Sequence, residues 1–143
     1  MQRGLSGTSF LKTCSKNDLR QGWSEIFKYG LLGSKKLINM IDYYFKHKSD
    51  RLLLSIIKKT IHIRLKIMKV NPLASNLGHT FGHAIEKITN NKILHGDAIS
   101  IGTVFALRFA NKNKIISGIK KDKIIKLMKN IGLRTHTDIK FNP

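Results

Sequence analysis

Apolar residues recur at helical spacing along almost the whole chain, and this periodicity constrains the fold more than any other feature. From Leu19 onward they follow the three- and four-residue spacing that gathers them on one face of a helix. No alternating run is long enough to predict a strand, and the sequence has no internal repeat and no glycine-rich phosphate loop between a strand and a helix. The sequence therefore predicts an all-α, multi-helix bundle.

Polar residues, glycine and proline divide this pattern into six predicted helices. The first is expected to run to about Leu31, and the third to end at Asn71-Pro72, because proline disfavours the helical conformation in the residue before it. The sixth is expected to end at Gly132 as a glycine C-cap. The expected starts of the first, second, third, fifth and sixth helices are Asn17 or Asp18, Ser34, Ser49 or Asp50, His95, and Asp122 or its neighbours.

The chain length and composition fit one globular domain. The 143 residues, 41% of them hydrophobic, can bury an ordinary core. Residues 1–8 lack periodicity and are expected to be a ragged start, with the helical domain at 9–143. The single cysteine, Cys14, cannot form an internal disulfide, and the sequence has neither a secretory signal nor an apolar run of about 18 residues. We therefore expect a cytoplasmic protein with no membrane partner.

The net charge of +19 has two explanations. A basic chain can bind nucleic acid or another polyanion. However, 21 lysines stand against 6 arginines and are spread along the whole chain. Arginine is the residue that recognises phosphate bidentately, so compositional drift is the favoured explanation and a nucleic-acid partner is not expected.

Three histidines next to glycines are the strongest chemical signal. His79 and His83 stand four residues apart in the predicted fourth helix, so their side chains share one face. His95 follows at the start of the fifth. Histidines converging at helix ends, completed by a carboxylate, can hold Zn²⁺ with one position open for substrate. A lone histidine more often serves as a cap or a core hydrogen-bonding group, but three within 17 residues favour a functional site.

Two carboxylates are candidates for the third ligand. Glu25 lies in an otherwise apolar and aromatic segment, where an unpaired charge would be costly to bury. The alternative is an exposed pair with Lys28 three residues on, which would contribute only about 0.3–0.5 kcal/mol. Glu86, three residues after His83, ranks lower because a solvent-facing position is plausible. His62, Lys66 and Lys69 are weaker signals, since solvated lysines are expected in a lysine-rich helix.

Segments 22–30, 76–86 and 94–102 resemble the motifs of 3-dehydroquinate synthase and the related sugar-phosphate cyclases in order, spacing and identity. The resemblance covers about residues 9–133. It implies the C-terminal helical domain of an enzyme whose N-terminal α/β domain binds NAD, with the active site between the two domains. The implied enzyme is a phosphate-eliminating carbon–oxygen lyase of the shikimate pathway, which leads to chorismate and the aromatic amino acids.

The resemblance also implies a substrate and cofactors. The substrate, a phosphorylated sugar acid, is 3-deoxy-D-arabino-heptulosonate 7-phosphate, and the products are 3-dehydroquinate and phosphate. NAD accepts a hydride and returns it, and Zn²⁺ or Co²⁺ polarises the reacting hydroxyl and carbonyl. The implied metal ligands are Glu25, His79 and His95. The other implied roles are catalytic for His83 and Lys28, substrate-binding for Lys66 (with Lys69 as a rival) and Asn76, and cofactor-binding for Thr13.

The chain departs from the family pattern at four places, one of which is Asn17-Asp18 in place of an Arg-Glu pair. It begins just before the first helical motif, so the nucleotide-binding domain is expected to be absent. Residues 70–75 are shortened, and Pro72 stands where an arginine that binds phosphate is expected. The last part of the domain is expected to be truncated after Pro143.

Because of these departures, we expect the chain to be a fragment that does not catalyse the full reaction by itself. The alternatives are a non-catalytic helical module that docks to a separate NAD-binding half, and a basic domain that binds polyanions. A homodimer is a further possible assembly.

Overall fold

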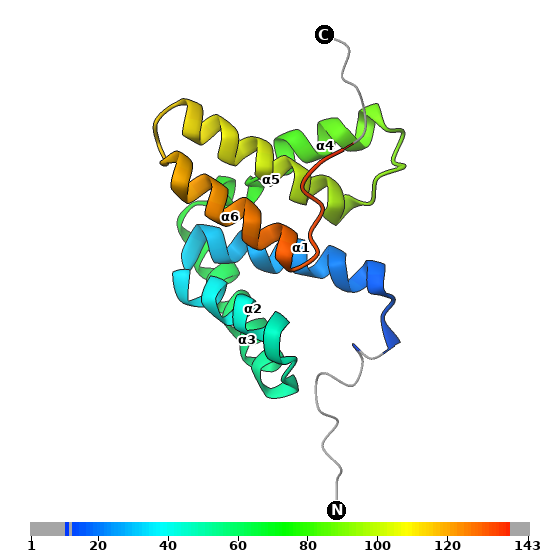
Figure 1. Ribbon diagram of the computed structural model, residues 1–143, viewed down its shortest axis with the longest axis vertical. Helices are drawn as coiled ribbons and strands as arrows, with labels where there is room; N and C mark the ends of the chain where they lie inside the picture. The colour runs from blue at the N-terminus through cyan, green and yellow to red at the C-terminus, as the bar shows by residue number, and fades with distance from the viewer. Residues whose placement is uncertain (1–10, 12, 138–143) are drawn as a thin grey trace, which may run out of the picture. The chain divides into compact units, whose positions relative to one another are not determined.

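The computed structural model describes residue 11 and residues 13–137, and the regular elements within them are all helical (Figure 1). The all-α prediction is confirmed. The predicted ragged start at 1–8 and the end of the chain beyond residue 137 lie outside the described residues. None of the described helices is long and apolar enough to cross a bilayer. In chain order the elements are α1 (Lys16–Gly33), α2 (Lys35–His47), α3 (Asp50–Val70), the short 3₁₀ helix η2 (Pro72–Asn76), α4 (His79–Ile88), α5 (His95–Lys112) and α6 (Gly118–Asn130).

These helices belong to two compact units, residues 1–75 and residues 76–143. The first unit contains α1, α2 and α3, and the second contains α4, α5 and α6. The single-domain boundary at 9–143 stays a prediction.

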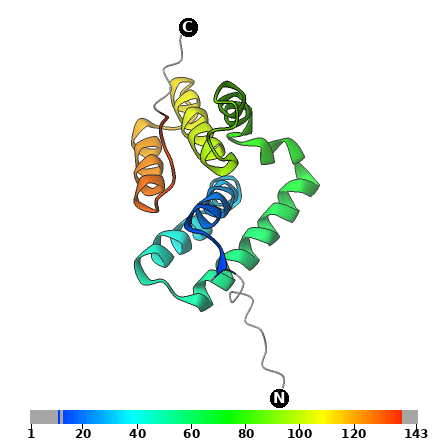
Figure 2. The same ribbon diagram turned by 90° about the vertical axis from the view of Figure 1, so that its right-hand side faces the viewer.

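Aromatic side chains hold the first unit together. Its three helices contact one another pairwise (Figure 2). Trp23 of α1 stacks on Tyr44 of α2 with 5.1 Å between ring centroids, and meets the edge of Phe45 at 4.9 Å. Phe27 of α1, Ile41 of α2 and Ile56 of α3 are almost completely buried. The apolar faces read from the sequence are therefore the faces that pack.

Each helix of the first unit begins at a serine that accepts a hydrogen bond from a backbone N–H of the first turn. Ser34 caps α2 and Ser49 caps α3, as predicted, and α3 ends at Asn71. The prediction for α1 was wrong, because Ser15 caps it rather than Asn17 or Asp18. The hydroxyl of Ser15 accepts from the backbone N–H of Asp18 at 3.1 Å. The helix also continues two residues beyond Leu31, to Gly33.

In the second unit, α4 and α5 form an antiparallel hairpin with very close backbones. A Cβ atom on Gly102 would lie 2.1 Å from the carbonyl oxygen of Gly78 and 2.8 Å from the backbone nitrogen of Gly82. Gly78, just before α4, has φ of +79°, a conformation that glycine adopts without strain. Gly78 and Gly82, which stand before His79 and His83, are therefore required by the packing of the two helices.

The last helix, α6, packs against α5. Its start was predicted too late, because Ser117 caps it and the helix begins at Gly118 rather than near Asp122. Its predicted end is confirmed, since Gly132 follows with φ of +82°. The N–H of Gly132 donates to the carbonyl of Lys129, and the N–H of Leu133 to that of Met128, which is the paired arrangement of a glycine-terminated helix.

Candidate metal centre

The three predicted histidines of the second unit lie together. His79 is the first residue of α4, His83 follows one turn later, and His95 is the first residue of α5. The ring centroids are 5.5 Å apart for His79 and His83, 5.6 Å for His79 and His95, and 6.1 Å for His83 and His95. His79 is half-buried, and the other two rings are exposed. The hairpin therefore brings together imidazoles that are up to 16 residues apart in the sequence.

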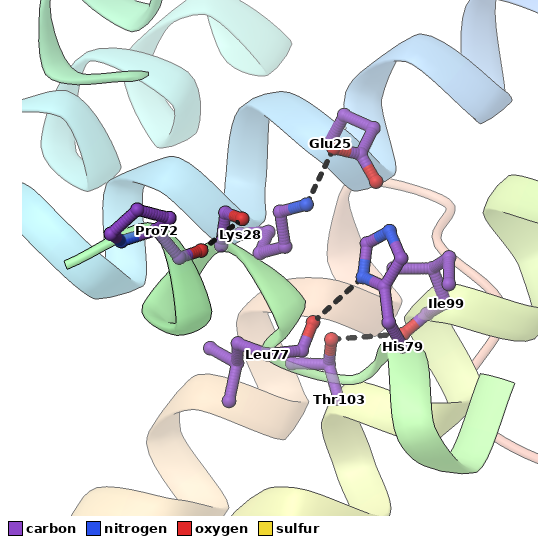
Figure 3. Close-up of polar contacts among 8 residues, drawn as sticks. Glu25, Lys28, Pro72, Leu77, His79, Ile99 and Thr103 are labelled. Carbon is purple, nitrogen blue, oxygen red and sulfur yellow. Dashed lines mark hydrogen bonds and ion pairs between the residues drawn. The ribbon is translucent and has the colours of Figure 1, made fainter. Parts of the chain in front are cut away.

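In both histidines predicted to be ligands, the same ring nitrogen faces an oxygen atom. Nδ1 of His79 lies 3.4 Å from the carbonyl oxygen of Leu77, a contact drawn in Figure 3. Nδ1 of His95 lies 2.9 Å from Oε1 of Glu86. An oxygen that only accepts hydrogen bonds selects the tautomer with hydrogen on Nδ1. That tautomer leaves Nε2 with its lone pair, which is the form that binds a metal ion.

Glu86, the carboxylate that the sequence ranked lower, is also part of this cluster. His83, Glu86 and His95 each offer a ligand atom within 4.8 Å of the others. The sequence contained a signal for this, because residues 79, 83 and 86 follow the spacing of one helical face. What the pattern did not supply was the register of α5 against that face.

Glu25 lies on α1 of the first unit, where it forms an ion pair with Lys28. The Nζ atom of Lys28 is 2.7 Å from Oε2 of Glu25, as Figure 3 shows. Lys28 is only 2% exposed and Glu25 is 36% exposed. This contact excludes the simple alternative of a fully solvated surface pair. The assignment of Glu25 as the third metal ligand stays a prediction.

Tyr29, next to this pair, has a perturbed phenol group. Burial raises the pKa of Tyr29 above 10.0, the positive charge of Arg64 opposes that change, and the negative charge of Glu25 adds to it. The carboxylate of Glu25 is thus part of a charged network within the first unit that includes cations on α1 and α3.

The remaining predicted site residues are exposed. Lys66 and its rival Lys69 lie on α3, as does His62. Asn76 ends η2, and Thr13 precedes α1. Lys66 and Thr13 belong to the first unit and Asn76 to the second. Their substrate- and cofactor-binding roles stay predictions.

The helices that carry the histidines differ from the others at their N-termini. Among the described α-helices, α4 and α5 begin without a side-chain cap, at Gly78 and Leu94. The first backbone N–H groups of a helix have no partner within the helix. In both helices the residue at the cap position accepts no such hydrogen bond, and a histidine is the first helical residue.

The donor atoms suit a borderline-soft divalent cation such as Zn²⁺. Imidazole nitrogen and carboxylate oxygen are both common zinc ligands, and catalytic sites keep one position open. Two neutral imidazoles and one carboxylate would leave the ion with a net positive charge, as a Lewis acid requires. The histidine pair therefore fits such a metal by donor type.

The described residues define an all-α protein that carries three histidines on one antiparallel hairpin, a candidate metal-binding helical domain. Residues 22–143 match the family model described as 3-dehydroquinate synthase C-terminal. The chain belongs to this family.

Curated relatives and a solved structure agree with this assignment. The chain is 34% identical to the 3-dehydroquinate synthase of Clostridium tetani over 141 residues, which are 90% of this chain and 37% of that protein. It is also 34% identical to the Pyrococcus furiosus enzyme, over 94% of this chain and 40% of that one. The chain therefore spans about two fifths of the length of these relatives.

A solved structure has the same fold. It is ValA, a 2-epi-5-epi-valiolone synthase from Streptomyces hygroscopicus subsp. jinggangensis with NAD⁺ and Zn²⁺ bound. The TM-score is 0.79 at 19% identity, over 90% of this chain and 39% of that one.

Proposed function

We propose that this chain supplies the metal- and substrate-binding helical part of a 3-dehydroquinate synthase, which converts 3-deoxy-D-arabino-heptulosonate 7-phosphate to 3-dehydroquinate and phosphate. One observation carries the proposal. His79 and His95 each have Nδ1 against an oxygen acceptor, so both keep Nε2 as a donor for one divalent cation. The family match supplies the reaction class.

We infer that Glu25 is the third ligand and that Zn²⁺ is the resident ion, as it is in the ValA structure. A cation held there would polarise a hydroxyl or carbonyl group of the substrate. Lys28, with its Nζ atom against Glu25, would hold that carboxylate in place and offer positive charge to the anionic substrate. His83 is exposed next to both other histidines, and it would carry a proton at its ring nitrogen.

The complete reaction requires hydride transfer, which NAD supplies. We propose that the helical part works only together with a nucleotide-binding part, either in the same polypeptide or in a separate one that docks to it. Adding the nucleotide-binding part of the Clostridium tetani relative, with NAD and substrate, is expected to produce phosphate release. Turnover by residues 1–143 alone would contradict this dependence.

Metal binding by the chain tests the proposal directly. We expect one Zn²⁺ per chain, measured by elemental analysis and by competition with a chromophoric chelator. The His79→Ala/His95→Ala variant is expected to lose at least about 100-fold in affinity, because both imidazole ligands are gone. Glu25→Ala is expected to weaken binding as well, since it removes the carboxylate.

The matched control is His62→Ala/His136→Ala, which removes two exposed histidines outside the cluster. It should bind zinc as the wild type does. Equal zinc affinity in the wild type and in the His79→Ala/His95→Ala variant would remove the metal site and, with it, the proposed function.

A further inference from the structure

The contact between Glu86 and His95 joins the two helices of the second unit. Oε1 of Glu86 lies 2.9 Å from Nδ1 of His95, the distance of a good hydrogen bond. The carboxylate is only 18% exposed, whereas the imidazole is 54% exposed. The carboxylate on α4 is thus the more restricted side chain. The ring on α5 has fewer packing contacts of its own, so the hydrogen bond can fix its orientation.

The backbone of the hairpin sets the position of Glu86. Along the two antiparallel helices, Gly78 lies against Thr103, Gly82 against Ile99 and Glu86 against His95. These positions are successive turns of α4 facing successive turns of α5. Because the glycine contacts are between backbones or close to them, the register cannot slip without a clash. The close packing of α4 against α5 therefore places Glu86 next to His95.

We propose that Glu86 is a positioning residue that holds His95 as the Nδ1-protonated tautomer and aims its Nε2 atom at the bound divalent cation. The metal part of this inference rests on the proposed function. A carboxylate that accepts from the distal nitrogen of a metal-bound histidine fixes the ring orientation and makes the ligating nitrogen more basic. Loss of such a partner costs about 10- to 100-fold in metal affinity.

The distance favours a hydrogen bond between these two atoms over their ligation of one shared ion. Two ligand atoms about 2.0–2.2 Å from one tetrahedral zinc ion are separated by about 3.3 Å. The observed separation of 2.9 Å is shorter and fits a shared hydrogen. The ring nitrogen facing Glu86 is therefore the one that carries the hydrogen, and the opposite nitrogen is the one available to the metal.

Two substitutions at Glu86 separate positioning from ligation. In Glu86→Gln the amide oxygen can still accept from Nδ1, whereas Glu86→Ala removes the acceptor. Asp42→Asn is the matched control, because it removes one carboxylate from an exposed ion pair with Lys46 on α2 and changes the net charge equally.

The first measurement uses the metal-free chain at about pH 8.5, above the ordinary histidine pKa of about 6.5. The ¹⁵N spectrum of the imidazoles distinguishes a protonated from an unprotonated ring nitrogen. His95 is expected to carry its hydrogen on Nδ1 in the wild type, in Glu86→Gln and in Asp42→Asn, and to become a mixture of tautomers in Glu86→Ala. A tautomer that is the same in all four chains overturns the inference.

The second measurement is zinc affinity by chelator competition. Glu86→Ala is expected to weaken binding about 10- to 100-fold, and Glu86→Gln by less than about tenfold. In a His95→Ala background, Glu86→Ala should cause no further loss, because it acts through His95. Equal losses in Gln and Ala variants, or a further loss in that background, would overturn positioning in favour of direct ligation.

Failure of this inference is distinguishable from failure of the proposed function. If the wild type binds zinc and Glu86→Ala binds it equally well, only the role of Glu86 is wrong. If the wild type binds no zinc, the metal role of Glu86 and the proposed function both fall, whatever the spectrum of His95 shows.

Discussion

The two units of this chain are both helical, but the closest contacts between their helices differ: side chains meet in the first unit, whereas backbones meet in the second. In the first unit large side chains fill the space between helices, as where Trp23 lies against Tyr44 and Phe45. In the second unit α4 and α5 approach through glycines, and the backbone around Gly102 leaves no room for a methyl group. Side-chain packing can adjust to small changes, whereas contact between backbones cannot. The unit that carries the histidines is therefore the one whose geometry is least adjustable.

The helix ends differ in the same sense. Serine side chains cap all three α-helices of the first unit, while α4 and α5 begin without such caps. A cap stabilises a helix start by about 1 kcal/mol. The helices α4 and α5 therefore lack this stabilisation, although α6 of the same unit is capped by Ser117.

The largest expected effect comes from adding one methyl group to a glycine in each unit. Gly102→Ala places Cβ against the carbonyl oxygen of Gly78 and should destabilise the chain by about 3 kcal/mol or more. Gly22→Ala in α1 meets nothing within 4 Å and should stabilise it by about 0.5–1 kcal/mol. Urea unfolding followed by circular dichroism measures both. Similar effects of the two substitutions would show that α4 and α5 are not in tight backbone contact at Gly102.

The next effect concerns the helix caps. Ser34→Ala should lower the free energy of unfolding by about 1 kcal/mol, because the backbone N–H of Leu37 loses its acceptor. Leu94→Ser should raise it by up to about 1 kcal/mol, since Leu94 is 46% exposed and already has the extended conformation of a cap. Thermal unfolding measures the two shifts, which should have opposite signs. A destabilised Leu94→Ser variant would mean that α5 gains nothing from a cap.

The smallest expected effect is a loss of stability at alkaline pH, caused by tyrosine ionisation in the first unit. The three tyrosines of the sequence all lie at positions 29, 43 and 44. Burial, and secondly the charge of Asp50, raises the pKa of Tyr44 above 10.0. The folded chain then holds the phenol proton more tightly than the unfolded chain does. Stability from this group is therefore complete below about pH 10 and falls as pH rises through the raised pKa.

Two variants test that slope against the wild type. Tyr44→Phe should reduce the fall in unfolding free energy between about pH 9 and pH 11 by removing the phenol. Asp50→Asn should reduce it less, because burial, the larger cause, remains. The measurement is urea unfolding at each pH. A slope that is identical in all three chains would show that Tyr44 does not contribute.

Helix starts show how far sequence reasoning reached. Ser34 was predicted as a cap, and Ser49 was one of two predicted starts beside Asp50, because a strongly periodic apolar segment follows each of them. Ser15 was missed since Asn17 and Asp18, equally good caps, follow it closely, and Ser15 instead accepts from the backbone of Asp18. The start of α6 after Ser117 was not predicted, because glycine and two lysines in its first turn interrupt the apolar periodicity. Local propensity therefore identifies a helix more reliably than it selects one cap among several polar neighbours.

For the candidate site, the residue types and their spacing identified His79, His83 and His95 as a set, and the hairpin brings them together. The role of Glu86 could not be read in the same way. Its partner His95 lies nine residues away on another helix, so the contact depends on the antiparallel register. Glu25, Lys28, Lys66, Asn76 and Thr13 keep the roles that the family resemblance implies, as predictions.

By itself, the sequence determined that the chain is helical and which family it belongs to, because hydrophobic periodicity and short motifs are local properties of the chain. Tertiary structure decided which nitrogen of His95 faces an acceptor, because the carboxylate of Glu86 reaches that ring only through the register of α4 against α5. The sequence feature that allows this contact is glycine at positions 78, 82 and 102. Because these residues have no side chain, α4 and α5 come close enough for Glu86 to reach His95.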